Sequence, residues 1–227
     1  NGCFVLLGGV GGDDLFAGYR RHQAVRYDKW LMSLPSGIRK LICKAGVSVL
    51  GKGPKSRRLR KFLARYQHES IDEVLAENYR WMDRQSLWSL FSDTIRNELE
   101  SYDPAKILLE NLSNIPEEQN PLNKLLFWDM KFFLGDHNLN YSDKASMQFG
   151  VELRVPFLDL ELIELSTRIP PDLKTKNGIS KYLLKKVAER YLPKDLIYRP
   201  KTGFGAPIRK WIVIDYEKEV LNQLELL

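Results

Sequence analysis

The feature that most constrains the fold lies at the start of the chain, where a short apolar run enters a turn made almost wholly of glycine. Phe4-Val5-Leu6-Leu7 is followed by Gly8-Gly9-Val10-Gly11-Gly12, and Asp13-Asp14 comes next. An apolar run bounded by glycines predicts a short buried strand that enters a flexible turn, with a helix starting near Asp13. Because a parallel strand is stable only inside a sheet covered by helices, we expect the end of an α/β domain here, with its sheet partners in sequence before Asn1.

Helical patterns dominate the rest of the chain, and no other convincing strand run follows the first. Apolar residues recur at helical spacing over residues 24–34, 38–50, 70–78, 86–90 and 121–134. Asp159 is expected to cap a further helix that stops at Pro170-Pro171, and residues 180–191 form another. The prediction is therefore a mainly α chain with one buried N-terminal strand.

Composition excludes several classes of protein. Of the 227 residues, 44% are hydrophobic and 28% are charged, as is usual for globular domains, and no apolar run approaches the ~20 residues that cross a bilayer. Cys3 and Cys43 form no C-x-x-C pair, so neither a disulfide framework nor a zinc site is indicated, and a cytoplasmic location is expected. The first residues do not have the pattern of a targeting peptide.

Much of the formal charge of +6 lies in one basic stretch, residues 52–65. Such a stretch can attract nucleic acid or another anionic surface. Here Leu59, Phe62 and Leu63 recur at helical spacing between the cations, which indicates an amphipathic helix with a solvated basic face. Base-stacking aromatics do not interleave with the cations, so a nucleic acid partner is not expected.

The glycine-rich turn has the geometry of a phosphate and metal site. Glycines let backbone N–H groups approach an anion, and a carboxylate beside the turn can bind Mg²⁺. Asp13 is the better candidate ligand, although it could equally be only a helix N-cap. The turn fits neither G-x-G-x-x-G nor the P-loop.

Two later segments also concentrate charge. Residues 143–147 and 150–159 place Lys144, Glu152 and Arg154 among residues that favour burial, which suggests either a structural ion pair or a ligand site. The turn that begins Arg199-Pro200-Lys201 and contains Gly203 and Gly205 could bind phosphate or be a solvated loop.

These three segments, in this order, resemble the S-G-D/E-G-x-D-E-L-F-x-G-Y, D-[RK]-x-S-M…V-E-x-R-V-P-F-L-D and R-x-K-x-G-F-G-x-P segments of the asparagine synthetase family. The resemblance extends from Gly8 to Trp211. It implies the C-terminal part of an α/β domain of the ATP-pyrophosphatase type (adenine nucleotide alpha hydrolase-like). Residues 1–20 would end the nucleotide-binding core, and residues 21–227 would be a mostly helical remainder.

The resemblance implies a reaction and its cofactors. Such enzymes use ATP and Mg²⁺ to adenylate a carboxylate, by default aspartate, and ammonia from a glutaminase domain then gives the amide, with AMP and pyrophosphate released. A homodimer is among the assemblies that the resemblance allows. By position, the implied site residues are Gly8, Gly9, Gly11 and Arg199 for the nucleotide, Asp13 for Mg²⁺, Lys144 and Lys201 for the phosphates, and Glu152 in an orienting role.

Two positions depart from the family pattern. Gly8 stands where the family has Ser, and Val10 stands where it has Asp or Glu. The S-G-G-x-D-S pyrophosphate loop and the glutaminase domain are also absent from these residues, so the chain alone is expected not to turn over. A relative that amidates sugars, closes β-lactams or cyclises peptides remains an alternative, as does a non-catalytic binding module.

Overall fold

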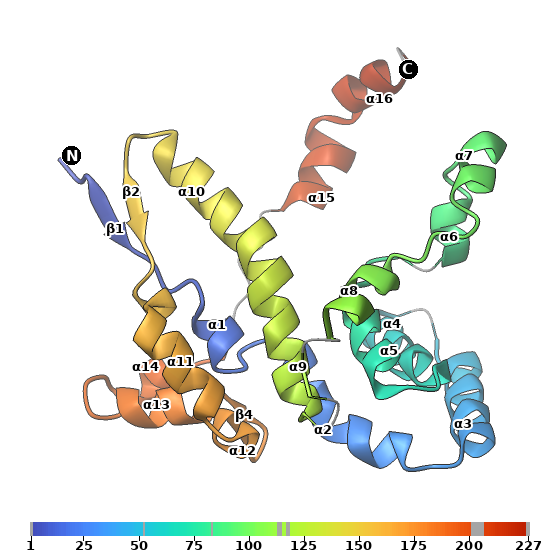
Figure 1. Ribbon diagram of the computed structural model, residues 1–227. Coiled ribbons are helices and arrows are strands. Elements are labelled where there is room, and N and C mark those ends of the chain that lie inside the picture. Colours follow the sequence, from blue (N-terminus) through green and yellow to red (C-terminus); the bar gives the residue numbers. More distant parts are fainter. Residues whose placement is uncertain are drawn as a thin grey trace. The chain divides into compact units, whose positions relative to one another are not determined.

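The structure is a computed structural model that describes residues 2–51, 53–82, 84–112, 115–116, 119–200 and 207–225. The chain divides into two compact units, Asn1–Lys186 and Val187–Leu227. Helices dominate among the described residues, as the sequence predicts (Figure 1). None of these helices combines the length and apolar character needed to span a bilayer.

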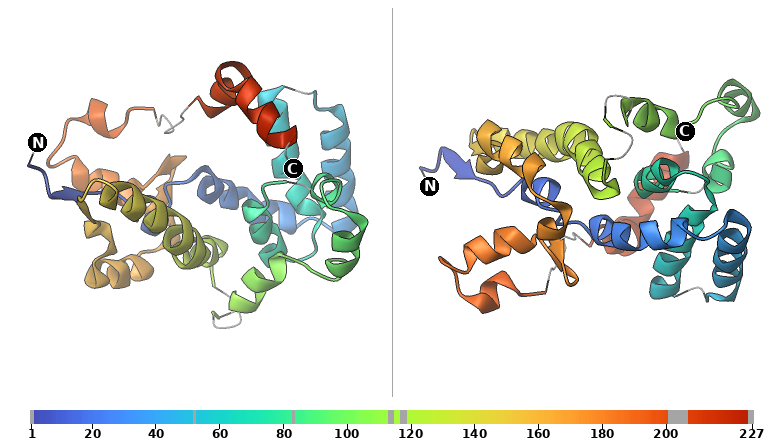
Figure 2. Two further views of the ribbon diagram at one scale, coloured as in Figure 1. Left: turned by 90° about the horizontal axis from the view of Figure 1, so that it is seen from above. Right: turned by 60° about the horizontal axis from the view of Figure 1, so that its bottom comes forward.

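The first unit opens with strand β1 (Val5–Leu7) and the short helix α1 (Gly12–Leu15). The elements that follow are α2 (Arg20–Met32), α3 (Ser36–Val49), α4 (Pro54–Ala64), η1 (Arg65–Gln67), α5 (Ile71–Ala76), η2 (Glu77–Tyr79), α6 (Arg84–Trp88), α7 (Asp93–Glu98) and α8 (Ala105–Leu112). Next come α9 (Pro121–Trp128), the π-helical stretch η3 (Asp129–Leu139) and α10 (Asn140–Met147). These three form one continuous rod, yellow-green in Figure 2.

The chain then passes through β2 (Glu152–Arg154), η4 (Pro156–Leu158), α11 (Leu160–Arg168), α12 (Pro171–Lys174), β3 (Thr175–Lys176), β4 (Ile179–Ser180) and α13 (Tyr182–Ala188), which ends in the second unit. The remaining elements of that unit are α14 (Lys194–Ile197), α15 (Ile208–Lys210), η5 (Trp211–Asp215) and α16 (Glu217–Glu225). The predicted cap of α11 is confirmed, because Asp159 Oδ1 accepts hydrogen bonds from the N–H groups of Glu161 and Leu162 at 3.0 and 3.3 Å.

The expectation of a single buried strand is wrong in two respects. Strand β1 pairs in parallel with β2, with Val5 opposite Glu152 and Leu7 opposite Arg154 (Figure 1). Strand β1 is also exposed, and Leu7 keeps 75% of its surface in contact with solvent. The physical reason is that, among the described residues, β2 is the only strand that pairs with β1.

The apolar cores of the first unit lie between its helices. Leu75, Leu125 and Trp128 belong to the largest cluster, and the Trp128 Nε1–H donates to the Leu108 carbonyl at 3.0 Å. A smaller cluster contains Leu15 and Phe16 at the end of α1, with Ile169 after α11. This smaller cluster anchors the residues that follow the glycine-rich turn.

The basic stretch forms the predicted amphipathic helix, α4. Phe62 and Leu63 pack on a core cluster, whereas Arg58 and Lys61 are exposed. Arg60 donates to the carbonyls of Leu50 and Gly51, both at 2.8 Å. This cation of the basic stretch therefore stabilises the end of α3 and the loop that follows it.

Candidate functional site

The glycine-rich turn lies directly against the segment that contains β2. The Gly8 N–H donates to the Arg154 carbonyl at 2.8 Å, and a Cβ at position 8 would lie 2.9 Å from Leu153 Cδ1. Gly11 has φ +91°, and a Cβ there would lie 2.5 Å from Leu158 Cδ2. The turn therefore requires glycine at position 11, both for the backbone conformation and for the close approach of η4.

Helix α1 sets the direction of the two acidic side chains. Its N-cap is Gly11, and Asp13 lies inside the helix, so the alternative that Asp13 is the N-cap is wrong. Asp13 Oδ1 lies 3.0 Å from Lys181 Nζ, which gives the carboxylate a cationic partner from a distant part of the sequence. Asp14, the next residue, points into the interior and is fully buried.

A cavity of about 410 Å³ opens beside this turn. It is lined by Gly9, Val10, Gly11, Asp13, Asp14, Tyr19, Phe133, Asn138 and Tyr141. Gly9 and Gly11 have no side chains to block it, and three aromatic rings form part of its wall. The cavity thus combines accessible backbone, two carboxylates and apolar surface, which is the usual composition of a small-molecule site.

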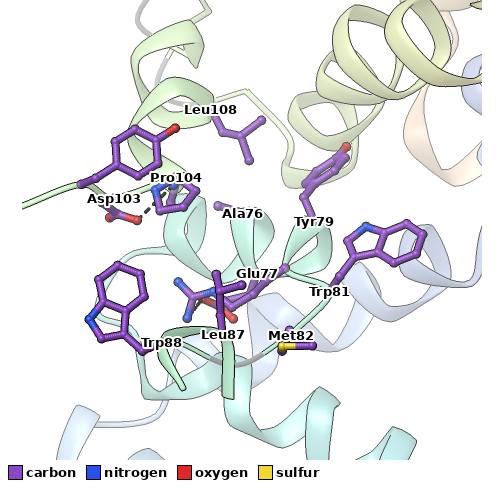
Figure 3. Close-up of a pocket in the computed structure, with 13 residues that line it drawn as sticks. Ala76, Glu77, Tyr79, Trp81, Met82, Leu87, Trp88, Asp103, Pro104 and Leu108 are labelled. Atoms are coloured by element: carbon purple, nitrogen blue, oxygen red, sulfur yellow. Dashed lines mark hydrogen bonds and ion pairs between the residues drawn. The ribbon is translucent and has the colours of Figure 1, made fainter. Parts of the chain in front are cut away.

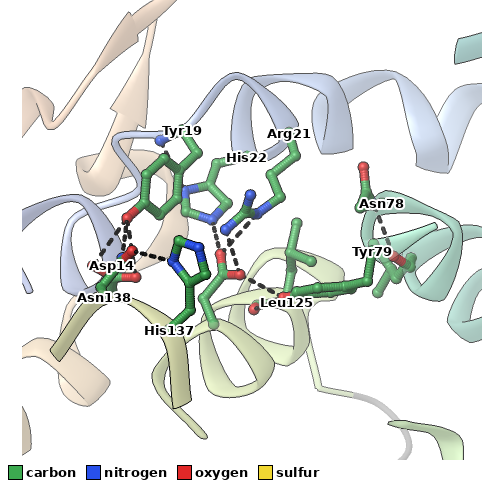
Figure 4. Close-up of polar contacts among 11 residues, drawn as sticks. Asp14, Tyr19, Arg21, His22, Asn78, Tyr79, Leu125, His137 and Asn138 are labelled. Atoms are coloured by element: carbon green, nitrogen blue, oxygen red, sulfur yellow. Dashed lines mark hydrogen bonds and ion pairs between the residues drawn. The ribbon is translucent and has the colours of Figure 1, made fainter. Parts of the chain in front are cut away.

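Asp14 is held in the wall of this cavity by a short chain of hydrogen bonds. The Tyr19 hydroxyl lies 3.3 Å from each Asp14 carboxyl oxygen, and it accepts a hydrogen bond from Asn138 Nδ2 at 3.1 Å (Figure 4). Burial, assisted by the negative charge of Asp129, raises the pKa of Asp14 to about 6. Asp14 is therefore a carboxyl group that changes protonation close to neutral pH.

Behind the cavity, Asp129 accepts hydrogen bonds from three side chains. Arg21 donates to both carboxylate oxygens at 2.7 and 3.1 Å, and His22 Nε2 and the Tyr79 hydroxyl each lie 2.5 Å from one of them (Figure 4). Hydrogen bonds from His22 and Arg21 outweigh burial and lower the pKa of Asp129. The network therefore holds an ionised carboxylate in the interior.

The tautomer of His22 follows from its two partners. Its Nδ1 lies 3.3 Å from the Tyr19 backbone N–H and accepts from it, so the ring proton lies on Nε2 and is donated to Asp129. Burial lowers the pKa of His22, which keeps the ring neutral and leaves Arg21 as the cation. The Arg21 guanidinium lies 4.3 Å from the ring centroid of Tyr19 and 4.5 Å from that of Phe133. The network thus supports two residues of the cavity wall.

Sequence reasoning missed this network. The only local signal is Asp129, a carboxylate that directly follows the buried apolar stripe of α9. Its partners are 50 to 108 residues away in the sequence, so the pattern around Asp129 does not identify them.

The structure brings together only some of the predicted site residues. Gly8, Gly9, Gly11 and Asp13 meet at the turn, whereas Lys144 is exposed on α10 and does not line the cavity. Arg199 is exposed and belongs to the second unit, and Lys201 lies outside the described residues.

Of the two alternatives given for Glu152 and Arg154, an ion pair or a ligand site, the structure shows the ion pair. Both side chains are exposed, and Arg154 Nε donates to Glu152 Oε1 at 2.9 Å. Residues two apart in a strand share one face of the sheet, so the pair forms within β2 itself. The pairing lowers the pKa of Glu152.

The described residues do not make a complete magnesium site. They contain no group of three His, Cys, Asp or Glu side chains placed to hold a metal ion. The Asp14 carboxyl group accepts a hydrogen bond from the Tyr19 hydroxyl, and the Asp13 carboxylate forms an ion pair with Lys181. The Asp13 carboxylate can therefore bind a cation only after its ion pair with Lys181 breaks.

A second cavity, of about 350 Å³, lies between η2, α6 and α8 and is lined largely by aromatic and apolar side chains (Figure 3). Trp81, Trp88 and Leu108 line it, together with the ion pair of Glu77 and Arg80 at 3.0 Å. None of the predicted site residues that the structure describes lines this cavity. It is therefore separate from the glycine-rich turn.

A parallel strand that enters a glycine turn beside a carboxylate is typical of proteins that bind phosphate groups. Comparison with known proteins defines the class more narrowly. The chain belongs to the asparagine synthase family, because the family model described as asparagine synthase matches residues 1–226.

Three relatives illustrate the similarity. Asparagine synthetase [glutamine-hydrolyzing] 1 of Bacillus subtilis is 29% identical over 225 residues, which are 97% of this chain and 33% of that protein. A putative asparagine synthetase [glutamine-hydrolyzing] of Mycobacterium bovis is 28% identical over 92% of this chain and 30% of its own length. The asparagine synthetase of Mus musculus is 42% identical over 67 residues, 28% of this chain and 12% of that protein. The chain thus spans about a third of the first two relatives, and no solved structure matches it.

Proposed function

We propose that the protein is an ATP-dependent, glutamine-dependent amidotransferase that adenylates a carboxylate, by default aspartate, and converts it to the amide with release of AMP and pyrophosphate. The observation that supports it most directly is the cavity at the glycine turn, since family membership predicts a nucleotide at that turn. Because the chain covers a third of its relatives, the substrates and the complete reaction belong to this proposal.

In this proposal the residues that line the cavity have different roles. Gly9 and Gly11 leave room for the nucleotide phosphates against the backbone. Phe133 and Tyr141 give the ligand apolar surface to pack against. Asn138 and Tyr19 keep Asp14 in place, so the acidic side chain that faces the ligand is Asp13.

The cofactors in this proposal are ATP and Mg²⁺. Mg²⁺ in such sites is held by one or two carboxylates together with substrate phosphates, and it neutralises phosphate charge. Asp13 would be its protein ligand once Lys181 releases the carboxylate. The roles that the resemblance implies for Lys144, Lys201, Arg199 and Glu152 stay predictions, since Lys144 does not line this cavity and Glu152 is exposed.

The proposal is tested with the protein as its gene encodes it, supplied with ATP, Mg²⁺, aspartate and glutamine. Pyrophosphate and asparagine are measured in the same reaction. Asp13→Asn is expected to lower the rate by about 10²–10³, as for loss of a preorganised electrostatic group. Asp93→Asn removes an exposed carboxylate far from the cavity and is the matched control. Pyrophosphate release that is unchanged in Asp13→Asn would refute the assignment.

One observation favours a second candidate within the same class, an amidotransferase that acts on a different carboxylate. Val10 lines the cavity at the position where the family has Asp or Glu. An apolar side chain there can neither move a proton nor bind a cation. If aspartate fails as a substrate and a less polar carboxylate replaces it, this candidate is favoured, and Val10→Glu is then expected to increase the use of aspartate.

A further inference from the structure

Lys174, the last residue of α12, is a lysine whose side chain packs inside the first unit. The residue is only 3% exposed. Other buried cations of the first unit have partners: Lys124 Nζ lies 2.9 Å from Asp72 Oδ1, and Arg65 donates to Asp28 at 2.9 Å. No described residue forms an ion pair or hydrogen bond with the ammonium of Lys174. A buried cation without a counter-charge is costly, so this position requires an explanation other than packing.

Lys174 lines a cavity of about 200 Å³ that contains a second unsatisfied group. Asn123 lines it, and Asn123 Oδ1 is a buried oxygen that no donor among the described residues reaches, although Asn123 Nδ2 donates to Gln119 Oε1 at 3.1 Å. Ser166 is also buried there, and its hydroxyl proton is donated to the Ile163 carbonyl at 2.7 Å. The cavity therefore offers a cationic donor, an unused acceptor and a hydroxyl oxygen.

The rest of the wall combines the apolar side chains of Leu15, Leu126, Phe127 and Met130 with the polar side chains of Asp14, Gln119 and Thr167. The volume is well above the ~10–15 Å³ that one water needs and below the ~300 Å³ of drug-sized ligand sites. It suits a molecule of a few heavy atoms. This cavity shares only Asp14 with the cavity at the glycine turn, so it is a different site.

We propose that this cavity binds a small amino or hydroxy acid. The carboxylate of the ligand pairs with Lys174, which supplies the missing counter-charge. The amino or hydroxyl group of the ligand donates to Asn123 Oδ1, which supplies the missing donor. The short aliphatic part lies against Leu126 and Met130.

The test is calorimetric titration of the protein with four probes: L-alanine, L-lactate, acetate and propylamine. Alanine and lactate are expected to bind most tightly, acetate more weakly, and propylamine not at all. Lys174→Met is expected to weaken binding of all three carboxylates about tenfold or more, because it removes a charged hydrogen-bond donor. Lys176→Met is the matched control, since Lys176 is an exposed lysine two residues away that does not line the cavity.

A second variant separates the two contacts. Asn123→Leu keeps the shape of the side chain but removes the acceptor, so it is expected to weaken alanine and lactate about tenfold and to leave acetate unchanged. Equal losses for all three probes would contradict the role of Asn123.

A labelling measurement needs no variant. Acylation of Lys174 by an amine-reactive ester, followed by peptide mass spectrometry, is expected to slow when alanine or lactate is present and to be unaffected by propylamine. The proposal is overturned if none of the carboxylates slows the labelling of Lys174. It is also overturned if Lys174→Met binds the carboxylates as tightly as the unsubstituted protein does. A carboxylate of the chain itself that already paired with Lys174 would make the labelling rate independent of added carboxylate, and this result would also overturn the proposal.

Discussion

Replacing Lys174 with methionine is expected to make the protein more stable at pH 7. Burial lowers the pKa of Lys174 from its usual 10.5 to about 8, because the interior disfavours the charged form. One pKa unit corresponds to about 1.4 kcal/mol, so the burial of this charged residue reduces the free energy of unfolding by about 3 kcal/mol at neutral pH. Methionine has similar length and no charge, so Lys174→Met should recover most of that free energy.

The gain must depend on pH in one direction. Below pH 8 both the folded and the unfolded states carry the proton on Lys174, and the full penalty is present. Between pH 8 and 10.5 the unfolded state binds more protons at Lys174 than the folded state does. The unsubstituted protein therefore gains stability relative to Lys174→Met as the pH rises. Above 10.5 both states are neutral at this position, and the advantage of Lys174→Met disappears.

Urea unfolding followed by far-UV circular dichroism at pH 7, 9 and 10.5 measures this difference. The native protein and the variant share all other titrating groups, so these cancel in the comparison. Lys176→Met, an exposed substitution, should change the free energy of unfolding by less than about 0.5 kcal/mol at every pH. A Lys174→Met protein that is less stable at pH 7, or whose difference from the native protein stays constant up to pH 10.5, would refute the reasoning.

Two further substitutions test the site and its support. Asp129→Asn leaves the Arg21 cation uncompensated and is expected to lower the free energy of unfolding in urea by about 3–5 kcal/mol. The control Asp93→Asn, at an exposed carboxylate, should lower it by less than about 0.5 kcal/mol. A similar small loss for both variants would contradict the role of the Asp129 network. Gly11→Ala forces a side chain into a left-handed conformation against Leu158 and is expected to cost about 1–3 kcal/mol in thermal unfolding. Gly37→Ala, in α3 with no atom within 4 Å of the new Cβ, should be neutral or stabilising by up to about 1 kcal/mol, and equal effects at both glycines would disprove the steric argument.

The parts of the fold that could be predicted are those whose signals are local. The helix after Asp159 was predictable because its cap and its apolar spacing lie within ten residues of each other. Strand β2 was not, because it has three residues and is defined only by pairing with β1 almost 150 residues earlier. Two of those three residues are charged, which hides the strand from any search for apolar runs.

The same distinction explains the site. The turn around Gly11 and Asp13 was predictable from its own residues, because glycines after a short apolar run indicate a strand that enters a turn, whereas its phosphate and metal role stays a prediction. Its ion pair with Lys181 was not, because that contact crosses most of the chain. The sequence left an ion pair and a ligand site open for Glu152, because an apolar context in sequence does not show which face of a strand is covered.

Asp14 decides which experiments can separate the two cavities. It is fully buried and lines both the cavity at the glycine turn and the cavity of Lys174. Any substitution there changes both walls and also removes the partner of Tyr19, so its effect cannot be assigned to either site. Lys174 and Asn123 line only one cavity, and Val10 lines only the other. A change in amidotransferase rate caused by Val10→Glu but not by Lys174→Met would therefore place the chemistry at the glycine turn and leave the second cavity to ligand binding alone.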